Sequence, residues 1–472
     1  MKVTEVERKE STKRCCGSGW TQRDSAEHEG YAGALIEPRI TEKNVTNADR
    51  PTEGLLEQII EANNLNRAYK RVKKNKGAGG VDGMETDELL QHLKDHGEEI
   101  RESIKAGQYR PQPVRRVEIP KENGKKRRLG IPTVTDRVIQ QAIAQVLTPI
   151  YEPQFADTSY GFRPNRSAHN AIRKCQEYLN EGYVWTVDMD LEKFFDTVNQ
   201  SKMVEILSRS IKDGRVISLI HKYFRAGSVW MGRFEDTEVG VPQGGPLSPI
   251  CANIMLNELD HELERRGHKF VRYADDMVIF CKSKASAKQT LAHIIPYIEK
   301  KLFLKVNREK TVVAYAGNIR FLGYGFYRGK DGFRMRVHEK TKQKTQKRVK
   351  ELTSRKRVND HKAWQKAIRQ YVTGWVNYYK LADMADFLRD VDEHMRRRIR
   401  MVFWKRWKRV RTRYANLRKL GAEHDKARAY SNTRKGYWQI AGSQILTTTL
   451  TNQRLEKDGF VFFSTYYRSV KA

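Results

Sequence analysis

The sequence predicts an α+β fold in which short strands come first and a helical region follows. Residues 271–280 read as two short strands around an acidic pair, Asp275 and Asp276. Residues 183–190 alternate apolar and polar side chains, which is typical of a strand, and they end in acid. From about residue 340 helical spacing dominates. Its clearest stripe has apolar side chains at i, i+4, i+7 and i+11, namely Ile368, Val372, Trp375 and Tyr379.

The adjacent carboxylates of Asp275 and Asp276 are a candidate metal site. Like charges this close repel each other, so the pair is unfavourable without a counter-charge. Mg²⁺ favours one or two carboxylates together with substrate phosphates, and Mn²⁺ accepts similar oxygen ligands. The alternative is an ordinary solvated turn between two strands, and this pair alone does not decide between the two.

A second acidic cluster, at residues 188–196, favours the metal. Asp190 together with Asp275 and Asp276 would supply ligands for two ions held about 3.5–4 Å apart, the arrangement that clamps the attacking and leaving oxygens of an in-line displacement. The alternative is that these acidic residues only cap a strand and open a helix. The presence of both clusters in one chain speaks against it.

Several motifs resemble those of reverse transcriptases. Tyr273-Ala-Asp-Asp276 and Asp190-Leu-Glu-Lys-Phe-Phe195 look like their two metal-binding motifs. Further blocks resemble, in order, the fingers hairpin (116–133), the block after it (159–166), the palm loop under the templating base (241–249) and the primer grip (321–324). From about Leu55 to the C-terminus the chain is similar to group II intron reverse transcriptases, also called maturases.

This resemblance implies a right-hand polymerase, with an antiparallel sheet in its fingers and palm, an α-helical thumb and a small basic C-terminal domain. Residues 1–50 are polar and lack periodicity, so a disordered tail is expected there. The other expected divisions are an N-terminal extension (51–107), fingers and palm (108–335), a helical thumb or maturase domain (336–410) and a C-terminal DNA-binding region (411–472).

The implied function is RNA-directed DNA polymerisation: intron RNA is copied into DNA at a target site, and the protein assists splicing by stabilising that RNA. Its partners would be the intron RNA, an RNA template with a DNA primer, target DNA and dNTPs. A maturase that only binds RNA, its polymerase site inactive, is the alternative. More distant alternatives are an RNA-directed RNA polymerase and a reverse transcriptase of a diversity-generating or defence element. The presence of both acidic motifs and of Gln243 favours an active enzyme.

Individual roles follow from the resemblance. Asp190, Asp275 and Asp276 would bind Mg²⁺, and the backbone carbonyl of Leu191 would complete a site. Lys121 and Arg127 would contact the triphosphate of the incoming nucleotide, Arg in bidentate fashion and Lys as a point charge. Gln243 would lie near the sugar and the template base, and the ring of Phe195 would exclude a 2′-hydroxyl. Lys310 would lie near the leaving pyrophosphate. Three further residues would act as supporting residues: Asp188, Arg272 and Tyr273.

The charge of the chain independently predicts a polyanionic partner. The formal net charge is +33 and the pI about 9.9. Residues 340–472 hold 34 Lys and Arg against 11 Asp and Glu, a net of +23. Arg406 and Lys408 are therefore expected to bind RNA, whereas Trp404 and Trp407, three residues apart, are expected mainly in the core.

Other classes are disfavoured. No apolar run approaches the length needed to cross a bilayer, and the N-terminal residues have no signal-peptide pattern. The five cysteines show no Cys-x-x-Cys spacing, so a reducing cytosol is expected. The resemblance implies a bacterial cytoplasm and a ribonucleoprotein with the intron RNA. No cysteine follows Cys281. Many members of this family end in a zinc-dependent endonuclease that contains cysteine pairs. The resemblance therefore points to the endonuclease-less bacterial class associated with group IIC introns.

Overall fold

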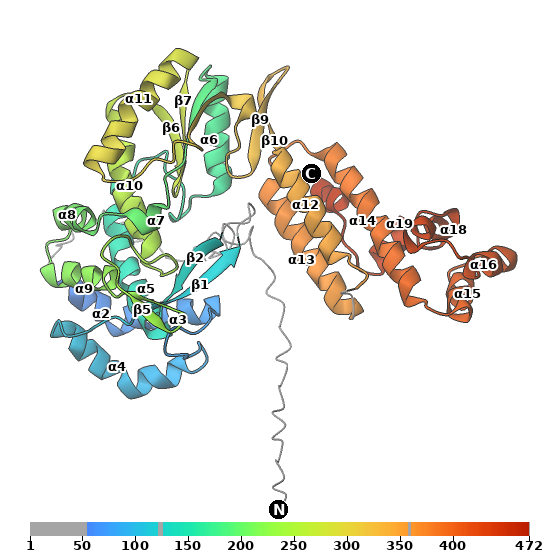
Figure 1. Ribbon diagram of the computed structural model, residues 1–472, viewed down its shortest axis with the longest axis horizontal. Helices are drawn as coiled ribbons and strands as arrows, with labels where there is room; N and C mark the ends of the chain where they lie inside the picture. Colours follow the sequence, from blue (N-terminus) through green and yellow to red (C-terminus); the bar gives the residue numbers. More distant parts are fainter. Residues whose placement is uncertain (1–53, 121–125, 357–359, 472) are drawn as a thin grey trace, which may run out of the picture. The chain divides into compact units, whose positions relative to one another are not determined.

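This computed structural model (Figure 1) has a four-stranded central sheet, and both acidic motifs lie at ends of its strands. The structure describes residues 54–120, 126–356 and 360–471, so the expected tail (1–50) and Lys121 lie outside the described residues. The sheet has the order β6-β7-β3-β8 and consists of β6 (Lys269–Tyr273), β7 (Asp276–Cys281), β3 (Trp185–Met189) and β8 (Val312–Tyr315). All its pairings are antiparallel. The strands predicted around the acidic pair and before Asp190 are confirmed.

Period-two alternation gives the central sheet two apolar faces. On β7, Met277 and Ile279 join one hydrophobic cluster, whereas Val278 and Phe280 join another. Helix α11 (Lys284–Lys301) packs on β3, β7 and β8, and α6 (Ala168–Asn180) packs on β6. With both faces covered, strand β7 is an almost continuous apolar run after its first residue.

A second four-stranded sheet has the order β2-β1-β4-β5. The expected hairpin forms: β1 (Val114–Pro120) pairs antiparallel with β2 (Lys126–Ile131). Strands β4 (Ser228–Trp230) and β5 (Arg233–Glu235) extend it. Helix α5 (Val134–Tyr151) follows directly, and its N-cap Thr133 accepts a hydrogen bond from the backbone N–H of Asp136.

Helices surround these sheets. The N-terminal ones are α2 (Leu55–Ile60), α3 (Ala62–Asn75) and α4 (Leu89–Lys105), and α2 and α3 pack on α5. Between β3 and β6 the chain forms α7 (Phe194–Thr197), α8 (Gln200–Ser210), α9 (Gly214–Phe224) and α10 (Ser248–Arg265). A hairpin of β9 (Tyr324–Gly329) and β10 (Gly332–Val337) then leads to the helical region.

The helical region begins with α12 (Glu339–Leu352), α13 (His361–Tyr379) and α14 (Ala385–Arg406). Ile368, Val372 and Trp375 are buried on α13, so the predicted stripe is confirmed. Shorter helices complete the described chain: α15 (Val410–Lys419), α16 (His424–Ser431), α17 (Tyr437–Ala441), α18 (Gln444–Thr449), α19 (Asn452–Lys457) and α20 (Phe463–Lys471).

Helix α20 packs back onto α13 and α14. The buried carboxylate of Asp392, on α14, accepts hydrogen bonds from the backbone N–H groups of Phe463 and Ser464, each at 2.8 Å. This side chain caps the start of α20. No helix in the described part of the chain has both the length and the apolar character needed to span a membrane.

Candidate active site

The acidic pair lies at the turn between β6 and β7, where Tyr273 is paired with Asp276 and the two residues between them form the turn. Ala274, the first of these, has a φ of +56°, in the left-handed region that only glycine adopts freely. Asp275 and Asp276 are exposed, whereas the strands behind them are buried. The fold therefore presents both carboxylates to solvent from a rigid, buried hairpin.

Strand β3 brings Asp190 to the same edge of the sheet. Its register pairs Met189 with Met277, so Asp190, the next residue, comes beside Asp276. The backbone carbonyl of Asp190 accepts a hydrogen bond from the N–H of Asn307 at 2.8 Å, and Leu191 forms a bridge with Val306. These contacts fix the backbone just after the strand. They also bring the segment carrying Lys310 over the site.

Lys310 contacts this cluster directly. Its Nζ lies 2.8 Å from Oδ2 of Asp190, although the two residues are 120 positions apart in the sequence. The Lys310 side chain is largely exposed, so this ion pair is worth little to stability. Its importance is electrostatic, because a positive charge lies at an otherwise acidic edge.

The carboxylates influence one another. Crowding by surrounding protein, followed by repulsion from Asp275, Asp188 and Asp190, raises the pKa of Asp276 above its ordinary value. Since Asp276 is exposed, repulsion carries more weight than burial in this shift. Partial burial and the charge of Asp190 raise the pKa of Asp188 to about 6. Together these residues form one electrostatically coupled acidic cluster.

The donor set suits a hard divalent cation: clustered carboxylate oxygens, a mutual repulsion that a cation relieves, and an open, solvent-facing edge. In the part of the chain that the structure describes, however, no three His, Cys, Asp or Glu side chains are grouped closely enough to hold a metal ion. The chemistry therefore fits a divalent cation, while the side chains are not gathered around one point.

The two phenylalanines after Asp190 have different environments. Phe194 is buried in the core, as expected, and Phe195 is only partly buried, with the two rings edge to face at 5.2 Å. The carbonyl of Phe195 accepts a hydrogen bond from the N–H of Val241 at 2.7 Å. The partly exposed ring is thus fixed beside the loop that contains Gln243.

The Gln243 loop also joins the second sheet. The N–H of Gly130, on β2, donates to the carbonyl of Gln243 at 2.8 Å, and Nε of Arg127 donates to its side-chain Oε1 at 3.2 Å. Gly244 has a φ of +122° and faces the Gly130 carbonyl so closely that a Cβ would lie 2.3 Å from it. Glycine is required here because the two backbones touch.

The two basic residues expected to bind RNA differ in their surroundings. Lys408 is exposed, whereas Arg406 is partly buried and hydrogen-bonds Nδ1 of His361 at 3.3 Å. His361 in turn contacts Asp458 at 2.9 Å. Trp404 is buried in the core, as predicted, and Trp407 partly so. Arg406 therefore has a structural contact in addition to its charge.

Sequence reasoning did not identify Arg320, whose positive charge offsets part of the rise in the pKa of Asp276, or Gly161, whose backbone touches the acidic turn. A Cβ on Gly161 would lie 2.2 Å from the backbone nitrogen of Ala274. Arg272, expected only as a supporting residue, is fully buried and paired with Asp260. A charged residue inside an otherwise apolar strand was the available signal for it.

Comparisons with known proteins identify the family of this chain. Residues 119–326 match the family described as reverse transcriptase (RNA-dependent DNA polymerase), and residues 342–421 match the group II intron, maturase-specific domain. Protein YkfC of Escherichia coli is 34% identical over 60% of this chain and 85% of its own length. The chain belongs to the group II intron reverse transcriptases. Members of the reverse transcriptase family generally use divalent metal ions.

Two other relatives have names that refer to introns. Group II intron-encoded protein LtrA of Lactococcus lactis is 32% identical over 62% of this chain, and the alignment spans 59% of LtrA. A 91 kDa protein in the cob intron of Schizosaccharomyces pombe is 38% identical over 43% of this chain and 25% of its own length. Among solved structures, a partial Cas6-RT-Cas1–Cas2 complex aligns at 23% identity over 52% of this chain and 43% of that chain, with a TM-score of 0.34.

Proposed function

We propose that this protein copies intron RNA into DNA at a target site by a two-metal mechanism, and that it assists splicing by binding the intron RNA. The observation that carries the proposal is the meeting of two acidic motifs, more than 80 residues apart in the sequence, at one edge of the central sheet. Lys310 adds a positive charge 2.8 Å from Asp190 at the same edge.

In this proposal Asp190, Asp275 and Asp276 hold two Mg²⁺ ions, for which Mn²⁺ can substitute, with the carbonyl of Leu191 as a further ligand. When bound, such ions activate the primer 3′-hydroxyl and neutralise charge on the leaving pyrophosphate. The protein orients the ligands through the rigid β6–β7 hairpin. Lys310, released from Asp190, offers its ammonium group to the pyrophosphate.

The nucleotide would lie beside the junction of the second sheet and the Gln243 loop. Arg127 and Lys121 contact its triphosphate in this proposal, and Gln243 lies near the sugar and the template base. The hydrogen bond between Arg127 and Gln243 supports this, because it links a phosphate-binding group to the loop that reads the base pair. Phe195, held beside the same loop, excludes a ribose 2′-hydroxyl.

The larger regions follow the same proposal. Residues 108–335 form fingers and palm, and residues 336–410 form a thumb that also holds intron RNA. Residues 411–472 contact target DNA. The net charge of +23 over residues 340–472 supports binding to phosphates, and Lys408 is an exposed member of this basic surface.

A second candidate is a splicing maturase that binds RNA without polymerising. The observation that favours it is the absence, among the described residues, of three side chains grouped to hold a metal. Against it stand the three aspartates and Gln243, all present in the chain.

Primer extension on an RNA template with dNTPs and Mg²⁺ distinguishes the two. Wild type should extend the primer, Asp275→Ala/Asp276→Ala should not, and Asp95→Ala, which changes an exposed aspartate on α4, should match wild type. If wild type binds intron RNA but extends no primer, the polymerase proposal fails and the maturase remains.

A further inference from the structure

A fully buried ion pair lies behind the acidic turn. Arg272 on β6 and Asp260 on α10 both have 0% exposed side chains, and Nη2 of Arg272 lies 2.5 Å from Oδ2 of Asp260. Nε of Arg272 donates to the two oxygens of the same carboxylate at 2.8 and 2.9 Å. Burying two charges in this way often contributes nothing to stability compared with apolar residues of similar volume. Stability alone therefore does not explain the pair.

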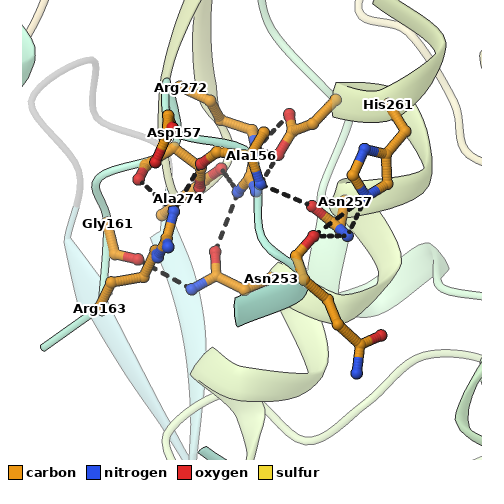
Figure 2. Close-up of polar contacts among 12 residues, drawn as sticks. Ala156, Asp157, Gly161, Arg163, Asn253, Asn257, His261, Arg272 and Ala274 are labelled. Atoms are coloured by element: carbon orange, nitrogen blue, oxygen red, sulfur yellow. Dashed lines mark hydrogen bonds and ion pairs between the residues drawn. The ribbon is translucent and has the colours of Figure 1, made fainter. Parts of the chain in front are cut away.

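The third guanidinium nitrogen of Arg272, Nη1, reaches the turn itself (Figure 2). Nη1 of Arg272 donates to the backbone carbonyl of Ala274 at 3.0 Å and to Oδ1 of Asn253 at 2.9 Å. Asn253, on α10, donates from Nδ2 to the carbonyl of Gly161 at 2.8 Å. The Arg272 side chain thus joins α10 to the turn that carries Asp275, and Asn253 joins α10 to the Gly161 loop.

Ala274 is the part of the turn that needs support. Its positive φ is costly for a residue with a Cβ, and such conformations persist only where the surroundings over-determine them. Arg272 holds its carbonyl, and the backbone of Gly161 packs against its nitrogen. The direction in which Asp275 leaves the turn depends on this peptide.

We propose that Arg272 is a positioning residue for the polymerase reaction, acting with Asp260 and Asn253 to fix the Ala274 peptide and so the direction of the Asp275 and Asp276 carboxylates. Asp260 orients the guanidinium plane, and Asn253 ties it to the Gly161 loop. The inference rests on the proposed polymerase function. It assigns to the buried pair a role in metal-ligand geometry beyond packing.

The test must separate positioning from folding. Removing one partner of a buried ion pair is strongly destabilising, whereas replacing both by apolar residues of similar size is often neutral. The principal variant is therefore Arg272→Met/Asp260→Leu, which fills the same space without the bond to Ala274. Arg272→Lys keeps the charge beside Asp260 but lacks the planar fork that serves three acceptors at once.

Arg163→Lys is the matched control. Arg163 is also buried, binds Glu152 and donates to the carbonyls of Ala156 and Ser159, but makes no hydrogen bond to Ala274. Each variant is compared in kcat for primer extension, in Kd for primer–template, in melting temperature, and in Mn²⁺ binding followed by electron paramagnetic resonance.

The double variant should lose about 10²-fold in kcat, as expected for misplacement of reacting groups by about 1 Å. Its primer–template Kd and melting temperature should stay near wild type, and its Mn²⁺ affinity should fall. Arg272→Lys should show the same pattern and decides the matter if the double variant does not fold. Arg163→Lys should keep the wild-type kcat and Mn²⁺ affinity.

The inference would be overturned if the folded double variant or Arg272→Lys kept a kcat for primer extension within threefold of wild type, with unchanged Mn²⁺ affinity. An equal loss in Arg163→Lys would overturn it too, by assigning the effect to general packing. If wild type itself fails to extend, the proposed function falls, and this inference falls with it.

Discussion

Substituting Gly161 by alanine should disable the site with little effect on the rest of the fold. The added Cβ would lie 2.2 Å from the backbone nitrogen of Ala274, and its other near neighbours are the adjoining backbone atoms. Ordinary van der Waals contact begins near 3.4 Å, so the turn or the loop must move by about 1.2 Å. Since both are backbone, no side chain can swing away to relieve the contact.

A shift of that size acts directly on the catalytic geometry. Displacing reacting groups by about 1 Å costs on the order of 10²-fold in rate. Single-turnover primer extension at saturating dNTP should therefore be about 10²-fold slower in Gly161→Ala, with primer–template affinity unchanged. The measurement is a rapid-quench time course at several Mg²⁺ concentrations, accompanied by a thermal melt.

Gly97→Ala is the control for this experiment. Gly97 lies within α4, and a Cβ there meets no atom within 4 Å. The substitution should be neutral in rate and should stabilise the helix by roughly 0.5–1 kcal/mol. If Gly161→Ala extends primers within twofold of wild type, the acidic turn is not held by this contact and the reasoning is wrong.

Four further substitutions test individual side chains. Phe195→Ala should raise rNTP incorporation relative to dNTP by about tenfold or more, measured by competition between the two nucleotides. Unchanged selectivity would show that this ring does not exclude the 2′-hydroxyl. Lys310→Ala should lower kcat by about tenfold with little change in melting temperature, because the exposed ion pair contributes little to stability. Lys408→Ala should reduce the salt dependence of RNA binding by about one unit of slope, whereas Arg406→Ala should in addition lower the melting temperature through its lost contact with His361. Salt titrations of intron RNA binding, with thermal melts in parallel, check both basic variants. Identical slopes of log K against log salt concentration in wild type and Lys408→Ala would show that Lys408 does not contact RNA phosphates.

The strands of the acidic motifs were predictable because their patterns are local. Alternation over residues 183–190 and the apolar runs around Asp275 depend only on side-chain periodicity, and all three strands formed within two residues of the expected limits. The α13 stripe was predictable for the same reason. Placing Asp190 beside Asp276 required more than periodicity, namely the resemblance of both motifs to one family.

The supporting contacts were not predictable in this way. The pairing of Arg272 with Asp260 joins a strand to a helix. The apolar residues around Arg272 indicate that it is buried, but no local pattern identifies Asp260 as its partner. Arg406 lies in a run of basic residues that includes the exposed Lys408 and Arg409, yet its side chain contacts His361. Such contacts depend on tertiary packing, which overrides the simple rule that charged residues face water.

The docking of α20 also bears on how the chain folds during synthesis. Asp392 and Phe463 are 71 residues apart, a stretch that a ribosome adds in roughly 4–14 s at about 5–20 residues per second. Until then the cap of α20 does not exist, and the apolar faces of α13 and α14 that α20 covers stay open. The two sheets earlier in the chain can be complete before α20 packs onto α13 and α14. During that interval the uncovered apolar faces of α13 and α14 would be open to chaperones.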